Sequence, residues 1–539
     1  MMLEGELPKT YEQFCDRCPG LSDSKRSTSN GGARSSEGST QASGKRPSTN
    51  AYVVMYLWNF KPNISIDALV DGQVMSFQVT KVASELGFSR ETQLKFESDS
   101  TAGSKNLWNF WLRSCSESHD RCRVSKREAF IPDRLIQIRT NNNESGFKWR
   151  LVCHPDKCIE YLTLSHCWGS LPHHKLTKDN ILESRELLTD SHLPKTYRDA
   201  FQIAVSLGFQ FIWIDSLCII QDDPGDWKTQ SSKMGSIYSN AYCNIAATWA
   251  MDGSDGCFSK RDPFLVDPTI LPLDLNHGQT VNHQIHQDAH HRKREVGYLR
   301  DVTDAPLNKR AWVVQERYLA KRQLSFAKPQ VYWECLELSA SEQYPAGIPT
   351  QLLYTRYDEV LPTPKPSIEF RGEFEFRRIW VLLVKLYSDC SVTHQSDKMI
   401  ALSGLVQELQ EITKDEYLAG LWKKDLSKQL CWEAKELEQS ASRVRTSVYT
   451  SPTWSWASMD GPVSIDAEYI EEYMPGSKST NVIEVIEASI CSEDPNKSHS
   501  FTSSKLVLKG VAVWGRVELR SEMDYELQPG KSIQNLSLG

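Results

Sequence analysis

Residues 193–215 read LPKTYRDAFQIAVSLGFQFIWID and contain a clear helix pattern followed by a clear strand pattern. Its first part predicts a helix, because apolar residues recur at helical spacing and Gly208 is well placed to end the helix at the C′ position. The recurring residues are Ala200, Ile203, Ala204 and Leu207. The last part, FQFIWID (209–215), is a nearly continuous apolar run. Such a run is typical of a strand that is buried on both faces of a parallel sheet.

The alternation of strand and helix continues on both sides of this stretch. YLTLS (161–165) and YCNIAAT (242–248) are further strand candidates. DWKTQSSKMGSIYSNA (226–241) predicts a second helix, with Asp226 as its N-cap. The order strand, helix, strand, helix, strand implies βαβ units. We therefore predict an α/β fold, in which a mainly parallel, doubly wound sheet carries helices on both faces.

We expect four regions along the chain. They are a disordered N-terminal region (1–50), an N-terminal α+β module (51–157), the α/β core (158–335) and a helical-plus-β C-terminal region (336–539). Residues 21–50 are nearly all Ser, Thr, Gly, Lys and Arg, so they cannot bury apolar surface. Within the core, we interpret the irregular stretch at about 259–307 as an exposed insertion.

The C-terminal region contains the aromatic segment PTWSWASMDG (452–461). Trp454 and Trp456 alternate with Ser455, so in a strand both indoles would share a face. We expect that face to pack on the α/β core and to tie the C-terminal region to it.

The composition excludes several classes of protein. The 539 residues carry a net charge of −7, and phosphate contacts need a clustered basic face, so we expect no nucleic-acid binding. No segment reaches the roughly 18 to 20 apolar residues of a membrane span, and AYVVMYLWNF (51–60) predicts a strand instead. The N-terminus lacks the pattern of a secretory signal. The 14 cysteines are therefore expected as reduced thiols in the cytoplasm or the nucleus.

Several motifs occur together and in a characteristic order. They are YLTLSHCWG (161–169), LPKTYRDAFQIAVSLGFQFIWIDSLCIIQDD (193–223), DWKTQSSKMGSIYSNAYCNIAAT (226–248), GCF (256–258) and RAWVVQERYLAKRQLSF (310–326). Jointly they resemble the fungal heterokaryon-incompatibility (HET) domain, which makes 158–335 the expected HET domain. The flanking stretches WLRSCSESHDRC, PDRLIQI, SDKMIALSGL and PTWSWASMDG are also similar to those of HET proteins.

The resemblance implies a role in fungal non-self recognition, in which the domain triggers growth arrest and death of fused cells that differ genetically. HET domains are distantly similar to Toll/interleukin-receptor (TIR) domains, which have a flavodoxin-like fold. Some TIR domains cleave NAD with one glutamate in a Ser-x-Trp-Cys-x-x-Glu pattern. RAWVVQE aligns Glu316 with that glutamate. The resemblance thus implies an NAD nucleosidase that needs no cofactor and takes NAD as its substrate.

A second hypothesis assigns no catalytic activity to the protein. In this alternative, the HET domain is a non-catalytic scaffold that signals by self-association. Because no separate recognition domain such as a repeat array is visible, we expect recognition to depend on a protein partner or on self-association.

The adjacent His166 and Cys167 first suggest an activated thiolate. However, neighbouring residues in a strand point to opposite faces, so the two side chains should diverge. We expect Cys167 to pack as a small hydrophobic residue, with Trp168 and Gly169 forming the turn at the strand end. A cysteine hydrolase is therefore the weakest of the hypotheses.

Ligands of open α/β sheets bind at the carboxyl ends of the strands. Ser165, Trp168 and Gly169 follow the first core strand, and Asp215 ends the second, so they are candidate residues for binding NAD. For Asp215, capping of the following turn is an equally good interpretation.

Glu316 is the candidate catalytic residue. Trp312 lies one helical turn before it and is a further candidate residue for binding NAD. A carboxylate there would stabilise positive charge on the ribose as nicotinamide leaves, much as carboxylates do in glycoside hydrolysis. The alternative is a structural glutamate that forms an ion pair with Arg310 or Arg317.

Two groups of residues have the composition of metal sites. Cys15 and Cys18 have zinc-knuckle spacing, and Cys115, His119 and Cys122 offer three further ligands. About 100 residues and a polar tract separate the two groups, so we expect free thiols and no metal site. The tract with His283, His286, His290 and His291 is expected to be a solvated loop.

Overall fold

The computed structural model describes sixteen stretches of the chain. They are residues 55–60, 63–70, 73–81, 99–123, 130–140, 146–156, 159–170, 174–261, 266, 269–274, 280–287, 297–348, 373–435, 451–465, 483–492 and 501–510. The predicted disorder of 21–50 and the pair Cys15 and Cys18 lie outside these residues, as do His290 and His291.

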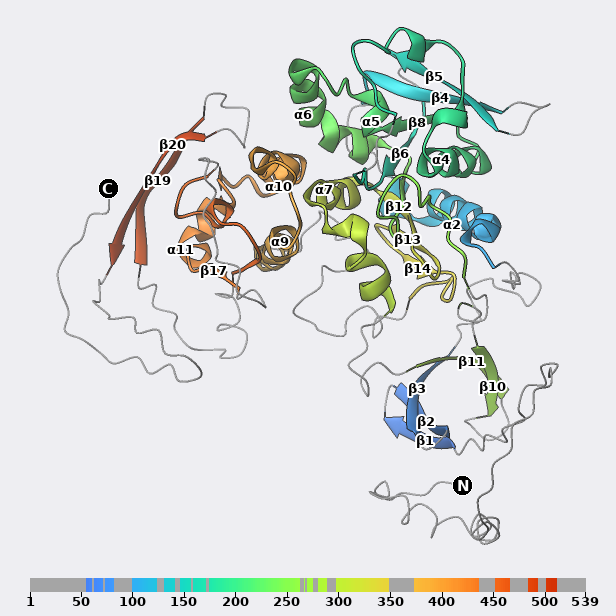
Figure 1. Cartoon of the computed structure of the whole chain (residues 1–539). Helices are drawn as coiled ribbons and strands as arrows, with labels where there is room; N and C mark the ends of the chain where they lie inside the picture. Colours follow the sequence, from blue (N-terminus) through green and yellow to red (C-terminus); the bar gives the residue numbers. More distant parts are fainter. Residues whose placement is uncertain are drawn as a thin grey trace, which may run out of the picture. The chain divides into compact units, whose positions relative to one another are not determined.

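A nine-stranded mixed sheet forms the centre of the described chain (Figure 1), with the strand order β14-β13-β12-β9-β6-β8-β4-β5-β7. Its four middle strands run parallel to one another. They are β8 (Phe211–Ile214), β6 (Leu162–Ser165), β9 (Cys243–Ala246) and β12 (Arg322–Phe326). Nearly every residue of these strands is buried, as expected for a parallel sheet that is covered on both faces.

Antiparallel strands extend the parallel centre on both sides. One side carries β4 (Arg134–Thr140), β5 (Phe147–Cys153) and β7 (Leu188–Thr189), and the other carries β13 (Val331–Cys335) and β14 (Ser339–Ser341). The sheet therefore continues across both boundaries expected for the core, at 157/158 and at 335/336. Antiparallel strands can pair without a crossover helix between them. Boundaries drawn from the alternation of strands and helices therefore leave these strands outside the core.

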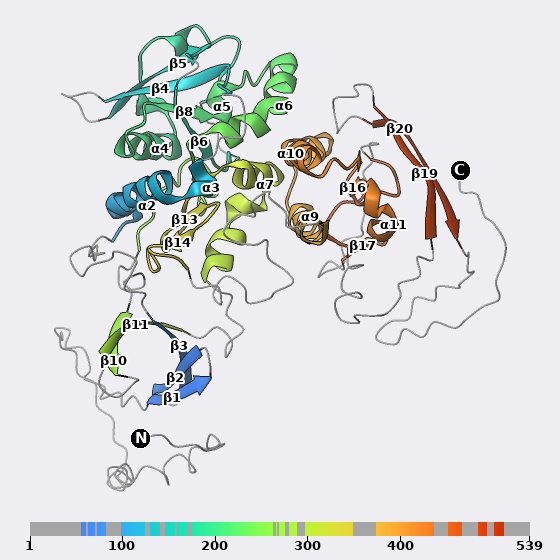
Figure 2. The same cartoon turned by 180° about the vertical axis from the view of Figure 1, so that it is seen from behind.

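Helices cover both faces of the sheet, as predicted. α2 (Lys105–Ser118) and α4 (Lys195–Ser206) lie on one side, and α6 (Pro224–Asn240) and α7 (Ala311–Leu319) lie on the other (Figures 1 and 2). The short helices α3 (Asp120–Arg123) and α5 (Asp215–Cys218) follow α2 and β8. The mainly parallel α/β core expected from the sequence is thus confirmed for its central strands.

Of the two helix ends predicted from the sequence, the end of α4 is confirmed and the start of α6 is wrong. Gly208 adopts a φ of +84° immediately after Leu207, the C-cap of α4, which confirms it as the stop signal. The predicted N-cap Asp226 of the next helix is wrong. Asp223 caps α6 instead, with Pro224 in the first turn. Asp226 binds Arg134, whose Nη2 donates to both carboxylate oxygens at 2.7 and 2.6 Å.

A second, five-stranded antiparallel sheet has the order β1-β2-β3-β11-β10. Its strands are β1 (Met55–Phe60), β2 (Asn63–Val70), β3 (Gln73–Lys81), β10 (Thr269–Asp274) and β11 (Thr280–Gln287). The interpretation of 259–307 as an irregular insertion is therefore wrong, because two strands lie there. β11 pairs with β3, about 200 residues earlier in the chain, and local periodicity carries no information on such a partner.

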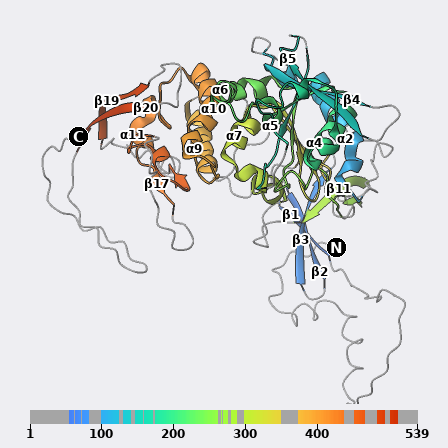
Figure 3. The same cartoon turned by 45° about the horizontal axis from the view of Figure 1, so that its top comes forward.

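The C-terminal region combines helices with small sheets, as expected. It contains α9 (Glu373–Ser388), α10 (Ser403–Thr413), α11 (Leu426–Gln429), β15 (Tyr417–Leu418), β16 (Leu421–Trp422), β17 (Glu433–Ala434), β18 (Val463–Ser464), β19 (Ile483–Ser492) and β20 (Phe501–Gly510). Helices α9 and α10 lie beside α6 and α7 (Figures 1 and 3).

Short helical turns complete the described structure. Turns of 3-10 helix lie at Thr101–Ser104, Glu183–Arg185, Asp190–His192, Pro306–Lys309, Gln395–Asp397, Ile400–Leu402, Lys423–Asp425 and Trp456–Ser458, and a π-helical turn lies at Leu299–Thr303.

The predicted strand at Trp454 and Trp456 is wrong. Ser455 caps a 3-10 turn here by accepting a hydrogen bond from the backbone of Ala457, so the two indoles do not share a strand face. The Trp456 ring lies 6.2 Å from Tyr387 in α9, and its Nε1 donates to the Gly420 carbonyl at 2.7 Å. Trp456 thus holds elements of the C-terminal region together.

Candidate functional site

The order of the parallel strands creates a switch point in the sheet. β6 comes first in the chain, β8 pairs on one side of it, and β9 followed by β12 pairs on the other. This order, second-first-third-fourth, is that of flavodoxin-like sheets, in which ligands bind at the carboxyl ends of the first and third strands. The corresponding strands here are β6 and β9, and β6 ends at Ser165.

A row of buried polar side chains crosses the sheet at this point. Asn244 of β9 is paired in register with Thr163 of β6 and with Gln323 of β12. Thr163 Oγ1 donates to Asn244 Oδ1 at 2.9 Å, and Asn244 Nδ2 donates to Ser165 Oγ and to Gln323 Oε1, both at 3.0 Å. Because the row is buried and internally bonded, it fixes the position of the Ser165 hydroxyl.

Glu316 lies in α7 against this strand end, and only 3% of it is exposed. Burial raises the pKa of its carboxyl group to about 7, because the charged form is poorly solvated. The nearby guanidinium of Arg310 lowers this pKa, and the charge of Asp215 raises it. Hydrogen bonds from the hydroxyl groups of Ser165 and Tyr238 favour the ionised form.

The arginines beside Glu316 have different partners. Arg317 is buried, and its Nη2 lies 3.0 Å from Glu334 Oε1 and 2.6 Å from the hydroxyl of Tyr298. Arg310 immediately precedes α7, and its Nη1 donates to the carbonyl of His166. Of the two ion-pair partners weighed from the sequence, Arg310 is the one whose charge acts on Glu316.

Asp215 both caps a turn and holds an aromatic ring. Its Oδ1 accepts from the backbone N–H of Ser216 at 2.7 Å. Its Oδ2 accepts from the indole Nε1 of Trp168 at 2.9 Å. Asp215 thereby connects the segment after β8 to the segment after β6, and the half-buried Trp168 ring is fixed at the edge of the sheet.

His166 and Cys167 diverge, as expected. His166 Nε2 lies 3.1 Å from the hydroxyl of Tyr197, and its Nδ1 lies 3.7 Å from Asp215 Oδ1. Cys167 packs with Ala246 and other apolar residues, and burial raises the pKa of its thiol. A buried thiol with a raised pKa is a poor nucleophile, so this pair lacks the arrangement of a Cys/His catalytic site.

The other two predicted site residues, Gly169 and Trp312, contact different parts of the chain. Gly169 has a φ of +69°, and a Cβ atom there would lie 2.3 Å from the Cβ of Asp252, so the tight turn requires glycine. Trp312 is half-buried, with its ring 6.3 Å from that of Trp227 in α6.

The structure thus brings three of the predicted site residues together. Ser165, Asp215 and Glu316 interact around the carboxyl group of Glu316, and Trp168 joins them through Asp215. Sequence reasoning missed the role of Asn244, although a polar residue in the middle of the apolar strand YCNIAAT is a visible signal of a buried network.

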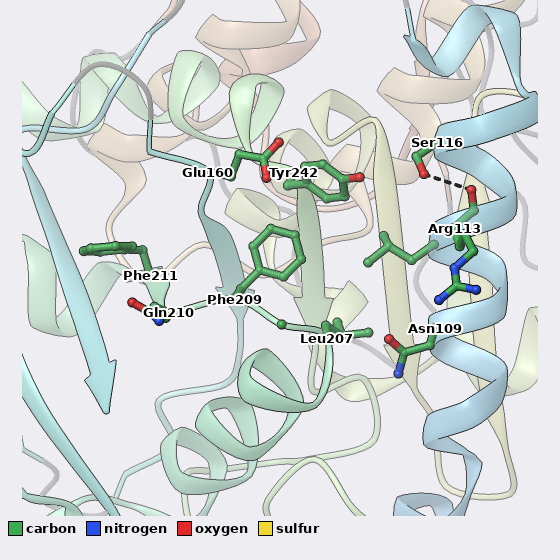
Figure 4. A pocket seen from close by; sticks show the side chains of 11 residues that line it. Asn109, Arg113, Ser116, Glu160, Leu207, Phe209, Gln210, Phe211 and Tyr242 are labelled. Atoms are coloured by element: carbon green, nitrogen blue, oxygen red, sulfur yellow. Dashed lines mark hydrogen bonds between the residues drawn. The ribbon is translucent and has the colours of Figure 1, made fainter. Parts of the chain in front are cut away.

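A hollow of about 490 Å³ lies at the opposite edge of the sheet. It is lined by residues that lead into β6, β8 and β9 and by α2, including Glu160, Phe209, Tyr242, Asn109 and Arg113 (Figure 4). These are the amino ends of the parallel strands, and none of the predicted site residues lines the hollow. Since ligands of such sheets bind at the carboxyl ends, we assign no function to it.

Comparison with known proteins agrees with this architecture. Residues 161–316 match the model of the family described as Heterokaryon incompatibility protein (HET). Residues 161–316 are thus similar to the HET domain. The match begins one residue before β6 and ends at Glu316, so the matched segment includes the carboxyl edge with the candidate site. It indicates a role in heterokaryon incompatibility.

The other comparisons give no further relatives. No curated protein and no solved structure matches the chain. Within the described ranges, no helix combines the length and the apolar character that crossing a membrane requires.

Proposed function

We propose that this protein acts in fungal non-self recognition and that its HET domain starts the death of fused cells by cleaving NAD. One observation carries the proposal. A buried carboxyl group, that of Glu316, lies beside the end of the first parallel strand at the switch point of the sheet. Strongly shifted carboxyl groups at such positions are frequent in active sites.

The proposed reaction breaks the bond between the nicotinamide nitrogen and C1 of the attached ribose. The electron pair of that bond stays on the nitrogen, so the pyridinium ring loses its positive charge. The ribose becomes an oxocarbenium cation, to which water adds before it loses a proton. The products are nicotinamide, ADP-ribose and a proton.

The ionised form of Glu316 would stabilise the cation that develops on the ribose. In a site of low dielectric constant, this attraction is stronger than in water. With a pKa of about 7, the carboxyl group is partly ionised near neutral pH. Ser165 and Tyr238 would hold the carboxylate in place through their hydroxyl groups.

Access to Glu316 requires a movement at the edge of the sheet. The carboxyl group is buried, the charges of Arg310 and Asp215 act on it, and Asp215 is hydrogen-bonded to Trp168. We propose that NAD enters between the turn after β6 and the start of α7, with the Trp168 indole as a surface on which the nicotinamide ring stacks. Such a gated site would suit a protein that must stay inactive until recognition occurs.

The test compares two buried glutamates in the full-length protein. Glu316→Gln keeps the shape of the side chain and removes its charge, so we expect normal folding and a loss of NAD cleavage by about a hundredfold or more. Glu334→Gln is the matched control, because Glu334 is equally buried but pairs with Arg317. It should lower stability and leave NAD cleavage of the folded protein unchanged.

Cell killing on fusion, scored in parallel, decides between catalysis and scaffolding. If the wild-type protein consumes no NAD, and Glu316→Gln self-associates and kills cells as the wild type does, the HET domain is a non-catalytic scaffold. A folded Glu316→Gln protein that consumes NAD at the wild-type rate would also end the catalytic proposal.

A further inference from the structure

Three cysteines and one histidine from distant parts of the chain meet beside β13. We call this group the Cys3His cluster; it consists of Cys115, His119, Cys122 and Cys335. The first three lie in and between α2 and α3, whereas Cys335 ends β13, 216 positions after His119. Their ligand atoms all lie within 4.8 Å of one another.

This geometry is close to that of a tetrahedral metal site. Zinc binds thiolate sulfur at about 2.3 Å and imidazole nitrogen at about 2.0 to 2.1 Å, so the ligand atoms of one zinc ion lie roughly 3.5 to 4 Å apart. In the cluster, His119 Nδ1 lies 3.3 Å from Cys335 Sγ. Small movements of the side chains would place all four ligand atoms around one ion.

We propose that the Cys3His cluster binds a structural zinc ion. Three thiolates and one neutral imidazole are a common ligand set for structural zinc. The cluster supplies four protein ligands, so no position remains for a substrate, and a catalytic role is not part of the proposal.

The surroundings of the sulfur atoms support this assignment. Arg322 Nε donates to Cys115 Sγ at 3.2 Å, and the backbone N–H of Leu338 donates to Cys335 Sγ at 3.2 Å. Three thiolates around a Zn²⁺ ion leave one net negative charge, which a guanidinium and N–H donors offset. Cysteines that only fill space in a core need no such donors.

The proposed ion would anchor the helices that precede the HET domain to the sheet. Around the cluster, Trp111 of α2 stacks on Trp333 of β13 with ring centroids 6.3 Å apart. The backbone N–H of Arg121 donates to Glu337 Oε1 at 2.6 Å. Zinc would thus reinforce an existing contact between segments that are far apart in the sequence.

From the sequence, we expected free thiols at the first three ligands, which have zinc-ligand character only together with Cys15 and Cys18. Cys335 is not part of that pattern, since a lone cysteine at a strand end carries no spacing signal. Only the pairing of β12 with β13 and the packing of α2 on β13 bring the fourth ligand to the others.

The first experiment measures metal in the full-length protein, purified under reducing conditions without chelators. We expect one zinc ion per chain by elemental mass spectrometry. X-ray absorption at the zinc edge should show three sulfur ligands and one nitrogen ligand. Removal of zinc with a strong chelator should lower the midpoint of thermal unfolding, and added zinc should restore it.

Four variants assign the ligands. Cys115→Ala and Cys335→Ala should each lose the zinc, whereas His119→Cys should keep it, because a fourth thiolate replaces the imidazole. The matched control is Cys257→Ala, since Cys257 is as fully buried as Cys115 but lies outside the cluster. It should keep one zinc ion per chain.

Several results would overturn the proposal. Wild-type protein that contains no zinc and takes none up when zinc is added would do so, as would a disulfide within the cluster found by peptide mass spectrometry. Retention of zinc in both alanine variants of the cluster would also refute it. If these variants do not fold, the metal content, ligand set and chelator response of the wild type still decide. None of these readouts depends on NAD cleavage.

Discussion

The carboxyl group of Glu316 is buried, so its ionisation costs free energy. Burial raises the pKa of the group, and the charge of Arg310 offsets only part of that effect. A glutamine would occupy the same space without the cost of a buried charge. The presence of glutamate is therefore better explained by a use of its charge than by packing.

Because of this buried carboxyl group, the free energy of unfolding of the protein should depend on pH. The pKa of Glu316 rises from an ordinary value of 4.5 to about 7 in the folded protein. Between these values the folded state holds a proton that the unfolded state has lost, so the free energy of unfolding falls as the pH rises through this window. The total fall contributed by this group is up to about 3 kcal/mol.

Glu316→Gln removes this dependence. We expect the variant to be more stable than the wild type by about 1 to 3 kcal/mol at pH 8, with the difference vanishing near pH 4.5. Urea unfolding at a series of pH values measures it. The exposed Glu411→Gln should follow the wild-type curve. Equal slopes for wild type and Glu316→Gln across this window would contradict the assignment of the shifted pKa.

Part of the site could be predicted from single residues and part could not. Ser165 and Asp215 end strands, and parallel strands place such residues at one edge, so their proximity follows from the pattern. Tyr238 and Asn244 lie within a helix and a strand. Their roles depend on how α6 packs and on the register of β9 with β6, which the sequence of either element alone does not define.

At the scale of elements, α6 and α10 cross with their backbones in close approach. A Cβ atom at Gly404 would lie 2.8 Å from the Cα of Gly235, and 2.9 Å from Oε1 of the buried Gln315 in α7. The two glycines therefore allow the C-terminal region to pack directly on the helices of the HET domain.

Gly404→Ala should disrupt this crossing. Alanine favours a helix by about 1 kcal/mol over glycine, but the backbone contact must open, at a cost of about 1 to 3 kcal/mol or more. We expect a lower midpoint of thermal unfolding and faster proteolysis of the C-terminal region. The control is Gly225→Ala in the first turn of α6, where the new Cβ would meet only a side-chain oxygen of Asp223. Equal stability of the two variants would disprove the close crossing.

Elements with a strong local period were the ones that could be predicted. The strands β6, β8 and β9 and the helices α4 and α6 follow from apolar runs and helical spacing. β10, β11 and the turn at Trp456 did not follow. An antiparallel strand is defined by its distant partner, and an alternating aromatic segment folds as a turn when a serine caps it.

At the scale of the whole molecule, the matched HET segment is smaller than the folded core. The sheet contains β4 and β5 before residue 161 and β12, β13 and β14 after residue 316. Without them, β8 and β9 would become edges of the parallel centre, with their buried residues and backbone groups exposed.

A fragment of residues 161–316 should therefore show no cooperative thermal unfolding, as followed by circular dichroism. A chain of residues 54–539 serves as control. Residues 54–539 form one compact unit, so this chain should unfold with the same transition as the full protein. A cooperative transition in the short fragment would show that the HET segment folds without its neighbouring strands.

The packing of α2 on β13 also matters during synthesis of the chain, because the helix is made before the strand. Trp111 on the apolar face of α2 leaves the ribosome well before Trp333 of β13, on which it stacks. His119 and Cys335 are 216 positions apart, so at roughly 5 to 20 residues per second the strand follows the helix by roughly 10 to 40 seconds. During that interval, the Trp111 indole and the thiols of Cys115 and Cys122 have no partner from β13, so we expect chaperones to bind this helix during synthesis.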